Sequence, residues 1–144
     1  MSEPTTPGLV GLHHFAFTVR DLDASIAWYQ KVFQTTPVEG TFPHYGRERT
    51  GYALLMIEPH TGITIGLHHN EGNQGEEFDE KRTGLDHIGL QVEGRDDLQA
   101  WADWLDTLGV AHSGIQRVTD PSTYSTVVFR DLDNIQLEFM APDV

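Results

Sequence analysis

The stretch Gly84–Val92, which reads GLDHIGLQV, decides the fold of this chain. Its apolar residues alternate with polar or small ones, so an extended strand carries them on opposite faces. The apolar face consists of Ile88, Leu90 and Val92, and the other face consists of His87, Gly89 and Gln91. A sheet that is packed on one side only favours this alternation. We therefore expect a strand whose open face carries His87.

The same pattern occurs a second time, in the stretch Gly11–Val19, which reads GLHHFAFTV. Apolar and polar residues alternate there in the same way, and His14 holds the position that His87 holds in the later stretch. This repeat is a stronger signal than either histidine alone, because it indicates two modules of similar architecture.

Length and charge restrict the class of protein. The chain has 144 residues, which is the length of one domain. With 9 Lys and Arg against 22 Asp and Glu, its formal net charge is −13, which argues against nucleic acids and anionic membranes as partners. The chain has no cysteine, so any metal must be held by nitrogen and oxygen ligands. The start of the sequence lacks a signal-peptide pattern, and no apolar run approaches the roughly 20 residues of a membrane span, so we expect a cytoplasmic protein.

In each half of the chain, the sequence predicts that the opening strand is followed by a helix and three further strands, in the order β-α-β-β-β. We expect one domain over residues 1–144, with a first module at about 9–69, a polar linker at 70–83 and a second module at about 84–142. Apolar residues at helical spacing predict the buried side of each helix. They are Leu22, Ile26, Tyr29 and Phe33 in the first module, and Leu98, Trp101, Leu105 and Leu108 in the second.

The strand face that points away from the helices collects polar side chains, and a polar, concave sheet face is a candidate site. Its members in the first and last strands of the modules are His14, Thr64, Gly66, His68, His87, Gln136 and Glu138. Before the last strand, Asn134 is expected at positive φ in a hairpin turn. Tyr124 and Arg130 share the polar face of the preceding strand and are candidate substrate contacts, with Arg130 suited to an anion. His44 is expected to be solvated in a loop, and His69 to point to the opposite face from His68.

Three segments resemble the vicinal oxygen chelate superfamily, which includes glyoxalases, bleomycin resistance proteins and extradiol dioxygenases. They are LHHFAFTVRDLDASIAWYQKVF (12–33), LDHIGLQV (85–92) and FRDLDNIQLEFMAP (129–142). The resemblance implies an α+β fold in which two βαβββ modules form a U-shaped, eight-stranded mixed sheet around a divalent metal. It also implies a homodimer, because family members commonly pair modules between subunits. The 14-residue linker, which could span about 46–50 Å, permits a site within one subunit or across two.

The metal ligands of the family fall on His14, Gly66, His87 and Glu138. Gly66 stands where glyoxalases carry a glutamate. The remaining three resemble the two-histidine, one-carboxylate triad of extradiol dioxygenases, which suits Fe(II) or Mn(II), while Ni(II) and Zn(II) stay open. His68 is a candidate fourth ligand if the strand bends at Gly66 into an empty corner, a catalytic acid/base, or a residue that only lines the cleft.

Three classes of function are consistent with these residues. The first is a metal-dependent dioxygenase, isomerase or lyase that acts on a small substrate with adjacent oxygens. The second is a drug- or metabolite-binding protein without metal, as in bleomycin-resistance members. The third is a ligand sensor or structural dimer, for which the sequence offers no specific support.

Overall fold

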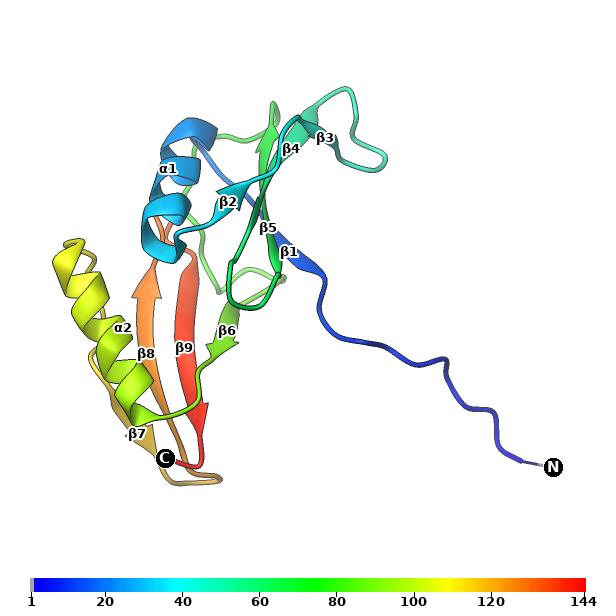
Figure 1. Ribbon diagram of the computed structural model, residues 1–144. Helices are drawn as coiled ribbons and strands as arrows, with labels where there is room; N and C mark the ends of the chain where they lie inside the picture. Colours follow the sequence, from blue (N-terminus) through cyan, green and yellow to red (C-terminus); the bar gives the residue numbers. More distant parts are fainter. Residues whose placement is uncertain (1) are drawn as a thin grey trace.

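The structure is a computed structural model that describes residues 2–144 (Figure 1). In these residues two helices and nine strands form two consecutive modules, each with one helix and its own sheet. The α+β, two-module architecture predicted from the repeat is therefore confirmed. Within residues 2–144 no helix has both the length and the apolar character that crossing a membrane requires.

The first module contains five strands and helix α1 (Leu22–Phe33). Its strands are β1 (His14–Thr18), β2 (Thr36–Pro37), β3 (Phe42–Pro43), β4 (Gly51–Ile57) and β5 (Thr64–Asn70). The second module contains four strands and helix α2 (Arg95–Thr107). Its strands are β6 (His87–Gln91), β7 (Gln116–Val118), β8 (Tyr124–Arg130) and β9 (Gln136–Pro142).

The two sheets have matching topology. The first has the strand order β1-β5-β4-β2, with β3 paired to β4, and the second has the order β6-β9-β8-β7. In each sheet the opening strand is parallel to the last one, β1 to β5 and β6 to β9, and the other pairs are antiparallel. In the described part of the chain, β1 and β6 are thus edge strands, and the expected eight-stranded sheet is divided into one sheet per module.

Local sequence accounts for both helices. Asp21 caps α1 by accepting a hydrogen bond from the Ala24 N–H at 3.1 Å, and Tyr29 and Phe33 of the predicted stripe are buried. Helix α2 buries Leu98 and Leu105 of its predicted stripe, while Trp101 and Leu108 are half-buried. It is followed by Gly109, whose φ of 70° few residues other than glycine adopt.

Helix α1 also packs against the second module. The Phe33 ring lies 6.4 Å from the ring of Phe129 in β8 and 6.1 Å from the ring of Phe139 in β9. On α2, the Trp104 indole N–H donates a hydrogen bond to the Val32 carbonyl oxygen at 2.8 Å. The modules therefore meet through their helix-facing sides and share one hydrophobic core.

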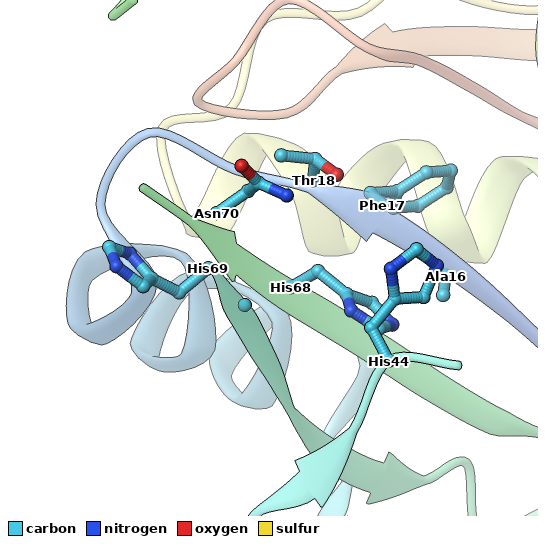
Figure 2. A pocket seen from close by; sticks show the side chains of 8 residues that line it. Ala16, Phe17, Thr18, His44, His68, His69 and Asn70 are labelled. Carbon is cyan, nitrogen blue, oxygen red and sulfur yellow. The ribbon is translucent and has the colours of Figure 1, made fainter. Parts of the chain in front are cut away.

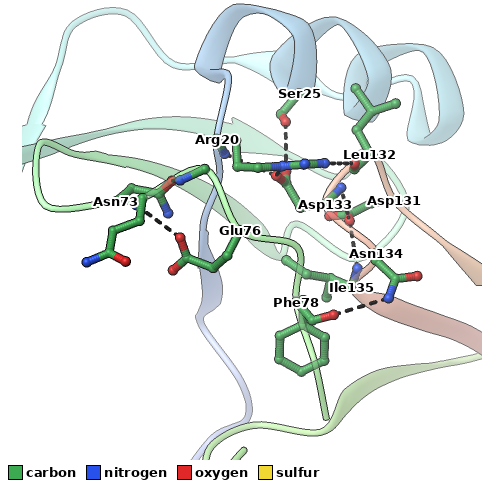
Figure 3. A network of polar contacts seen from close by, with 12 residues as sticks. Arg20, Ser25, Asn73, Glu76, Phe78, Asp131, Leu132, Asp133, Asn134 and Ile135 are labelled. Atoms are coloured by element: carbon green, nitrogen blue, oxygen red, sulfur yellow. Dashed lines mark hydrogen bonds and ion pairs between the residues drawn. The ribbon is translucent and has the colours of Figure 1, made fainter.

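A partly buried polar network joins α1 to the turn between β8 and β9 (Figure 3). The Tyr29 hydroxyl donates to the Asp131 carboxylate at 2.6 Å, and the Arg20 guanidinium donates to the Asp133 carboxylate at 2.8 Å. Ser25 donates to Asp133 as well, at 3.3 Å. We call Arg20, Ser25, Tyr29, Asp131 and Asp133 the intermodule network. Asn134 in the same turn has a φ of 66°, as predicted.

The linker is fastened to this turn. The Phe78 N–H donates to the Asp133 carbonyl oxygen at 2.8 Å, and the Asn134 side chain donates to the Phe78 carbonyl oxygen at 3.1 Å. Further along, Glu80 forms an ion pair with Arg130 at 2.5 Å. These contacts fasten the end of the linker to the second module.

Candidate functional site

The second module places a histidine and a carboxylate together. His87 and Glu138 lie on the neighbouring strands β6 and β9, and Gly89 is the residue directly opposite Glu138. The His87 Nε2 atom lies 3.5 Å from a Glu138 carboxylate oxygen. A Cβ atom at Gly89 would lie only 3.3 Å from that oxygen, so the glycine leaves the space that the carboxylate occupies.

Asp86 orients the His87 ring. Its carboxylate lies 2.6 Å from the His87 Nδ1 atom, which leaves Nε2 directed toward Glu138. A histidine that binds a metal through one ring nitrogen usually donates a hydrogen bond from the other to a carboxylate, a backbone carbonyl or water. Asp86 was not predicted from the sequence, although its position directly before the strand histidine is visible there.

The first module places His14 and His68 on the polar face of its own sheet. His14 is exposed near the start of β1, and its Nδ1 atom lies 2.9 Å from the Nδ1 atom of His13. His68 lies on β5 opposite Thr18, four residues beyond His14 along β1. As predicted, His69 turns to the other face, where its ring lies 5.3 Å from the Tyr52 ring.

The corner beside Gly66 is filled. A Cβ atom at Gly66 would lie 3.1 Å from both the Ala16 methyl group and a Leu55 methyl group. Strand β5 pairs with β4 without interruption from Thr64 to Asn70, so it has no bulge at Gly66. The empty corner expected at this position is thus absent from the described structure, because Leu55 on the neighbouring strand occupies it.

A cavity of about 160 Å³ lies beside His68 (Figure 2). His44, in the loop after β3, packs the edge of its ring against the His68 ring, with the centroids 5.0 Å apart. His44 is exposed in a loop, as predicted, but its contact with His68 was not predicted, because strand periodicity carries no information about loops. Burial lowers the pKa of His68, and repulsion from the charged forms of His44 and His14 lowers it further.

The two candidate substrate contacts lie elsewhere on the second sheet. The Arg130 guanidinium is held by the Glu80 carboxylate, by the Asn134 carbonyl oxygen at 2.9 Å and by the Gln136 side chain at 3.2 Å. Tyr124 is half-buried at the start of β8, opposite Pro142. The guanidinium is therefore already engaged by the linker and by its own module.

One chain does not assemble the predicted ligand set. Within residues 2–144 no three His, Asp or Glu side chains converge as a metal ion would require. His14 and His68 lie on the first sheet, and the His87–Glu138 pair lies on the second. The predicted ligands therefore lie in two separate groups, one on each sheet.

An open groove of about 1140 Å³ lies between the modules. Its lining is mainly apolar and includes Phe15, Ile65, Ile88, Leu90, Trp101 and Phe139. Ile88 and Leu90 of the edge strand β6 are only half-buried. This leaves apolar surface beside two strand edges that carry no strand partner in the described part of the chain.

Comparison with known proteins agrees with this architecture. The profile of the Glyoxalase/Bleomycin resistance protein/Dioxygenase superfamily matches residues 11–139. A glyoxylase/bleomycin resistance protein/dioxygenase domain from Frankia sp. EAN1pec is 32% identical, with a TM-score of 0.79 over 94% of this chain and 99% of that one. The search of curated proteins gives no match.

Two more distant structures share the fold. A variant of the fosfomycin resistance protein FosX from Listeria monocytogenes, in complex with Mn(II) and a dihydroxypropylphosphonic acid, is 18% identical with a TM-score of 0.62, over 95% of this chain and 96% of that one. Lactoylglutathione lyase from Agrobacterium tumefaciens is 16% identical with a TM-score of 0.64, over 93% and 95%. From the matching profile and the Frankia relative it follows that the chain belongs to the Glyoxalase/Bleomycin resistance protein/Dioxygenase superfamily.

Proposed function

We propose that this protein is a divalent-metal-dependent enzyme that acts on a small substrate with adjacent oxygen atoms, as a dioxygenase, isomerase or lyase. His87 and Glu138 of one protomer and His14 of its partner in a homodimer hold the metal. The observation that carries this proposal is the local geometry in the second module, where Gly89 leaves room for the Glu138 carboxylate beside a histidine that Asp86 orients.

The donor set fits a first-row divalent metal. Two imidazole nitrogens and one carboxylate suit Fe(II), Mn(II), Ni(II) or Zn(II), and three protein ligands leave positions open for a substrate. When bound, such a metal acts as a Lewis acid toward the substrate oxygens. Asp86 keeps the His87 ring in the orientation in which Nε2 can bind.

A second copy of the chain supplies what one chain lacks. His14 lies on edge strand β1, His87 lies on edge strand β6, and Glu138 lies on the neighbouring strand β9. The groove between the modules is lined by His87 and by half-buried apolar residues of β6. Edge strands and apolar surface of this kind are normally covered. Pairing β1 of one protomer with β6 of another would cover both and bring the three ligands together.

His68 is not a ligand in this proposal. The uninterrupted pairing of β5 and the apolar groups beside Gly66 give it no bend toward the ligand position. Its ring instead faces the cavity on the polar face, where it can donate a hydrogen bond to the substrate or exchange a proton with it.

Metal binding tests the first part of the proposal. The thermal midpoint of metal-free protein should rise on addition of Mn(II), Fe(II), Ni(II) or Zn(II), since a ligand at about 100 times its Kd adds roughly 2.7 kcal/mol of stability. Glu138→Gln should abolish the effect, and Asp86→Asn should weaken the metal affinity by about 10–100-fold. Asp106→Asn is the matched control, because Asp106 also pairs with a histidine but is not part of the proposed site. Its carboxylate lies 2.8 Å from the His112 Nε2 atom. Equal melting with and without every metal would favour a metal-free binding protein.

Mixing two defective variants tests the shared site. His14→Ala and Glu138→Ala should each fail to bind metal. After exchange of subunits, an equal mixture should recover about a quarter of the wild-type sites, because half of the dimers are then mixed and each holds one complete site. A mixture that recovers no sites would contradict a site shared between protomers. Loss of metal binding in each variant alone would then still support His14 and Glu138 as ligands.

A further inference from the structure

The cavity beside His68 is unusual for so acidic a chain. Its lining consists of Ala16, Phe17, Thr18, His44, Gly51, His68, His69 and Asn70. The chain carries 22 Asp and Glu against 9 Lys and Arg, yet no carboxylate is among these residues. Figure 2 shows the two imidazole rings side by side, with Thr18 and Asn70 further along the same wall.

Several polar side chains that line this cavity carry hydrogen-bond donors that are not used within the described part of the protein. Across residues 2–144, no hydrogen bond links the rings of His44 and His68 or the Thr18 hydroxyl to other protein groups. Asn70 uses its side-chain oxygen to accept from the Gly72 N–H at 2.8 Å, which leaves its amide N–H groups free. The cavity is therefore lined by N–H and O–H donors, and its lining contains no carboxylate that could accept hydrogen bonds from them.

The size of the cavity limits what it can hold. At about 160 Å³ it is well below the roughly 300–1,000 Å³ of sites for drug-sized ligands, so it accommodates a small group only. One wall is fixed by backbone, because a Cβ atom at Gly51 would lie 2.7 Å from the His69 carbonyl oxygen.

We propose that this cavity is a subsite for a small oxyanion, a carboxylate or a phosphate-like group, with His44 and His68 as its principal donors. Hydrogen bonds to an anion are roughly twice as strong as those between neutral groups, and two imidazoles with a hydroxyl and an amide can supply several of them. An organic cation such as an ammonium group is disfavoured, since no carboxylate lines the cavity. The inference adds an anionic substrate to the proposed function and in that respect rests on it.

Anion binding to the metal-free protein tests this inference apart from the metal site. The ring C–H signals of the histidines are followed by NMR at neutral pH and constant ionic strength, while phosphate, acetate or neutral acetamide is added. We expect saturable shifts of the His44 and His68 signals with at least one of the two anions and none with acetamide. The anion that binds more tightly identifies the class of substrate group.

Variants complete the test. His68→Asn and His44→Asn should each weaken anion binding by about tenfold or more, the loss of one charge-assisted hydrogen bond. His60→Asn is the control, because this exposed ring lies in the turn between β4 and β5 and contacts Glu58 at 2.8 Å. An unchanged His112 signal, whose ring bonds Asp106, reports that each variant is folded. Unsaturable shifts, or equal affinity in all variants, would overturn the inference and leave the proposed metal site untouched.

Discussion

Replacing Tyr29 by Phe isolates one hydrogen bond of the intermodule network. The Tyr29 side chain is fully buried, and its hydroxyl donates to the Asp131 carboxylate at 2.6 Å. The ring stacks on Phe33, with the centroids 6.0 Å apart, and phenylalanine preserves that contact. Asp131 keeps two further donors, the backbone N–H groups of Asp133 and Ile135. The variant therefore loses the bond between the modules and little else.

The expected loss follows from the charge of the acceptor. A hydrogen bond to an ionised group contributes about 1.5–3 kcal/mol, and the Asp131 carboxylate would stay buried with one donor fewer. For a chain of this size, 1 kcal/mol corresponds to roughly 2–4 °C in the thermal midpoint, so the variant should melt about 3–12 °C lower. Because Tyr29 and Asp131 belong to different modules, the unfolding transition should also become less cooperative.

The stability deficit of the Tyr29→Phe variant should depend on pH in a defined direction. Burial raises the pKa of Asp131 above its ordinary value, and the Tyr29 hydrogen bond opposes that rise. Without the hydroxyl the folded-state pKa rises further above the unfolded one. A carboxyl group with a raised folded pKa contributes stability at low pH that is lost as the pH rises through that pKa. The deficit of the variant should therefore be full at neutral pH and shrink in acid.

Urea unfolding at a series of pH values measures this deficit. Tyr52→Phe is the matched control, because the Tyr52 ring is 41% exposed and packs beside His69. The control should unfold at the wild-type urea concentration throughout. A Tyr29→Phe variant as stable as wild type, or a deficit that does not change with pH, would refute the role assigned to this hydrogen bond.

Three further predictions concern the site and the packing of the modules. Gly89→Ala should lower metal affinity by about tenfold or more, since its Cβ atom would lie 3.3 Å from the Glu138 carboxylate, whereas Gly94→Ala meets no atom within 4 Å; calorimetric titration compares the two. Trp104→Phe should cost about 1 kcal/mol in urea unfolding, because the Val32 carbonyl oxygen loses its indole donor. Light scattering at micromolar concentration should report a dimer, and a monomer there would contradict the shared site.

Strand periodicity was sufficient to predict which residues lie on the polar faces of the two sheets. His14, His87 and Glu138 lie on the polar faces of their sheets because alternation within a few residues decides the face. The positive φ of Asn134 was predictable for the same local reason, since a tight turn between two strands requires it.

The features that the sequence did not reveal depend on contacts between distant segments. The packing of α1 on the second sheet depends on Phe33 meeting Phe129 and Phe139, about a hundred residues away in the chain. Leu55 fills the place beside Gly66 from a neighbouring strand, and His44 reaches His68 from a loop. Periodicity within one segment contains no information about such partners.

The separation of His14 from the His87–Glu138 pair has a thermodynamic consequence. If the ligands meet only between protomers, metal binding and association share one free energy, and each strengthens the other by the same factor. Dilution would then release metal, and metal depletion would dissociate the dimer. The protein would therefore respond to its own abundance as well as to metal supply, and its apparent metal affinity would be a property of the solution rather than of the chain.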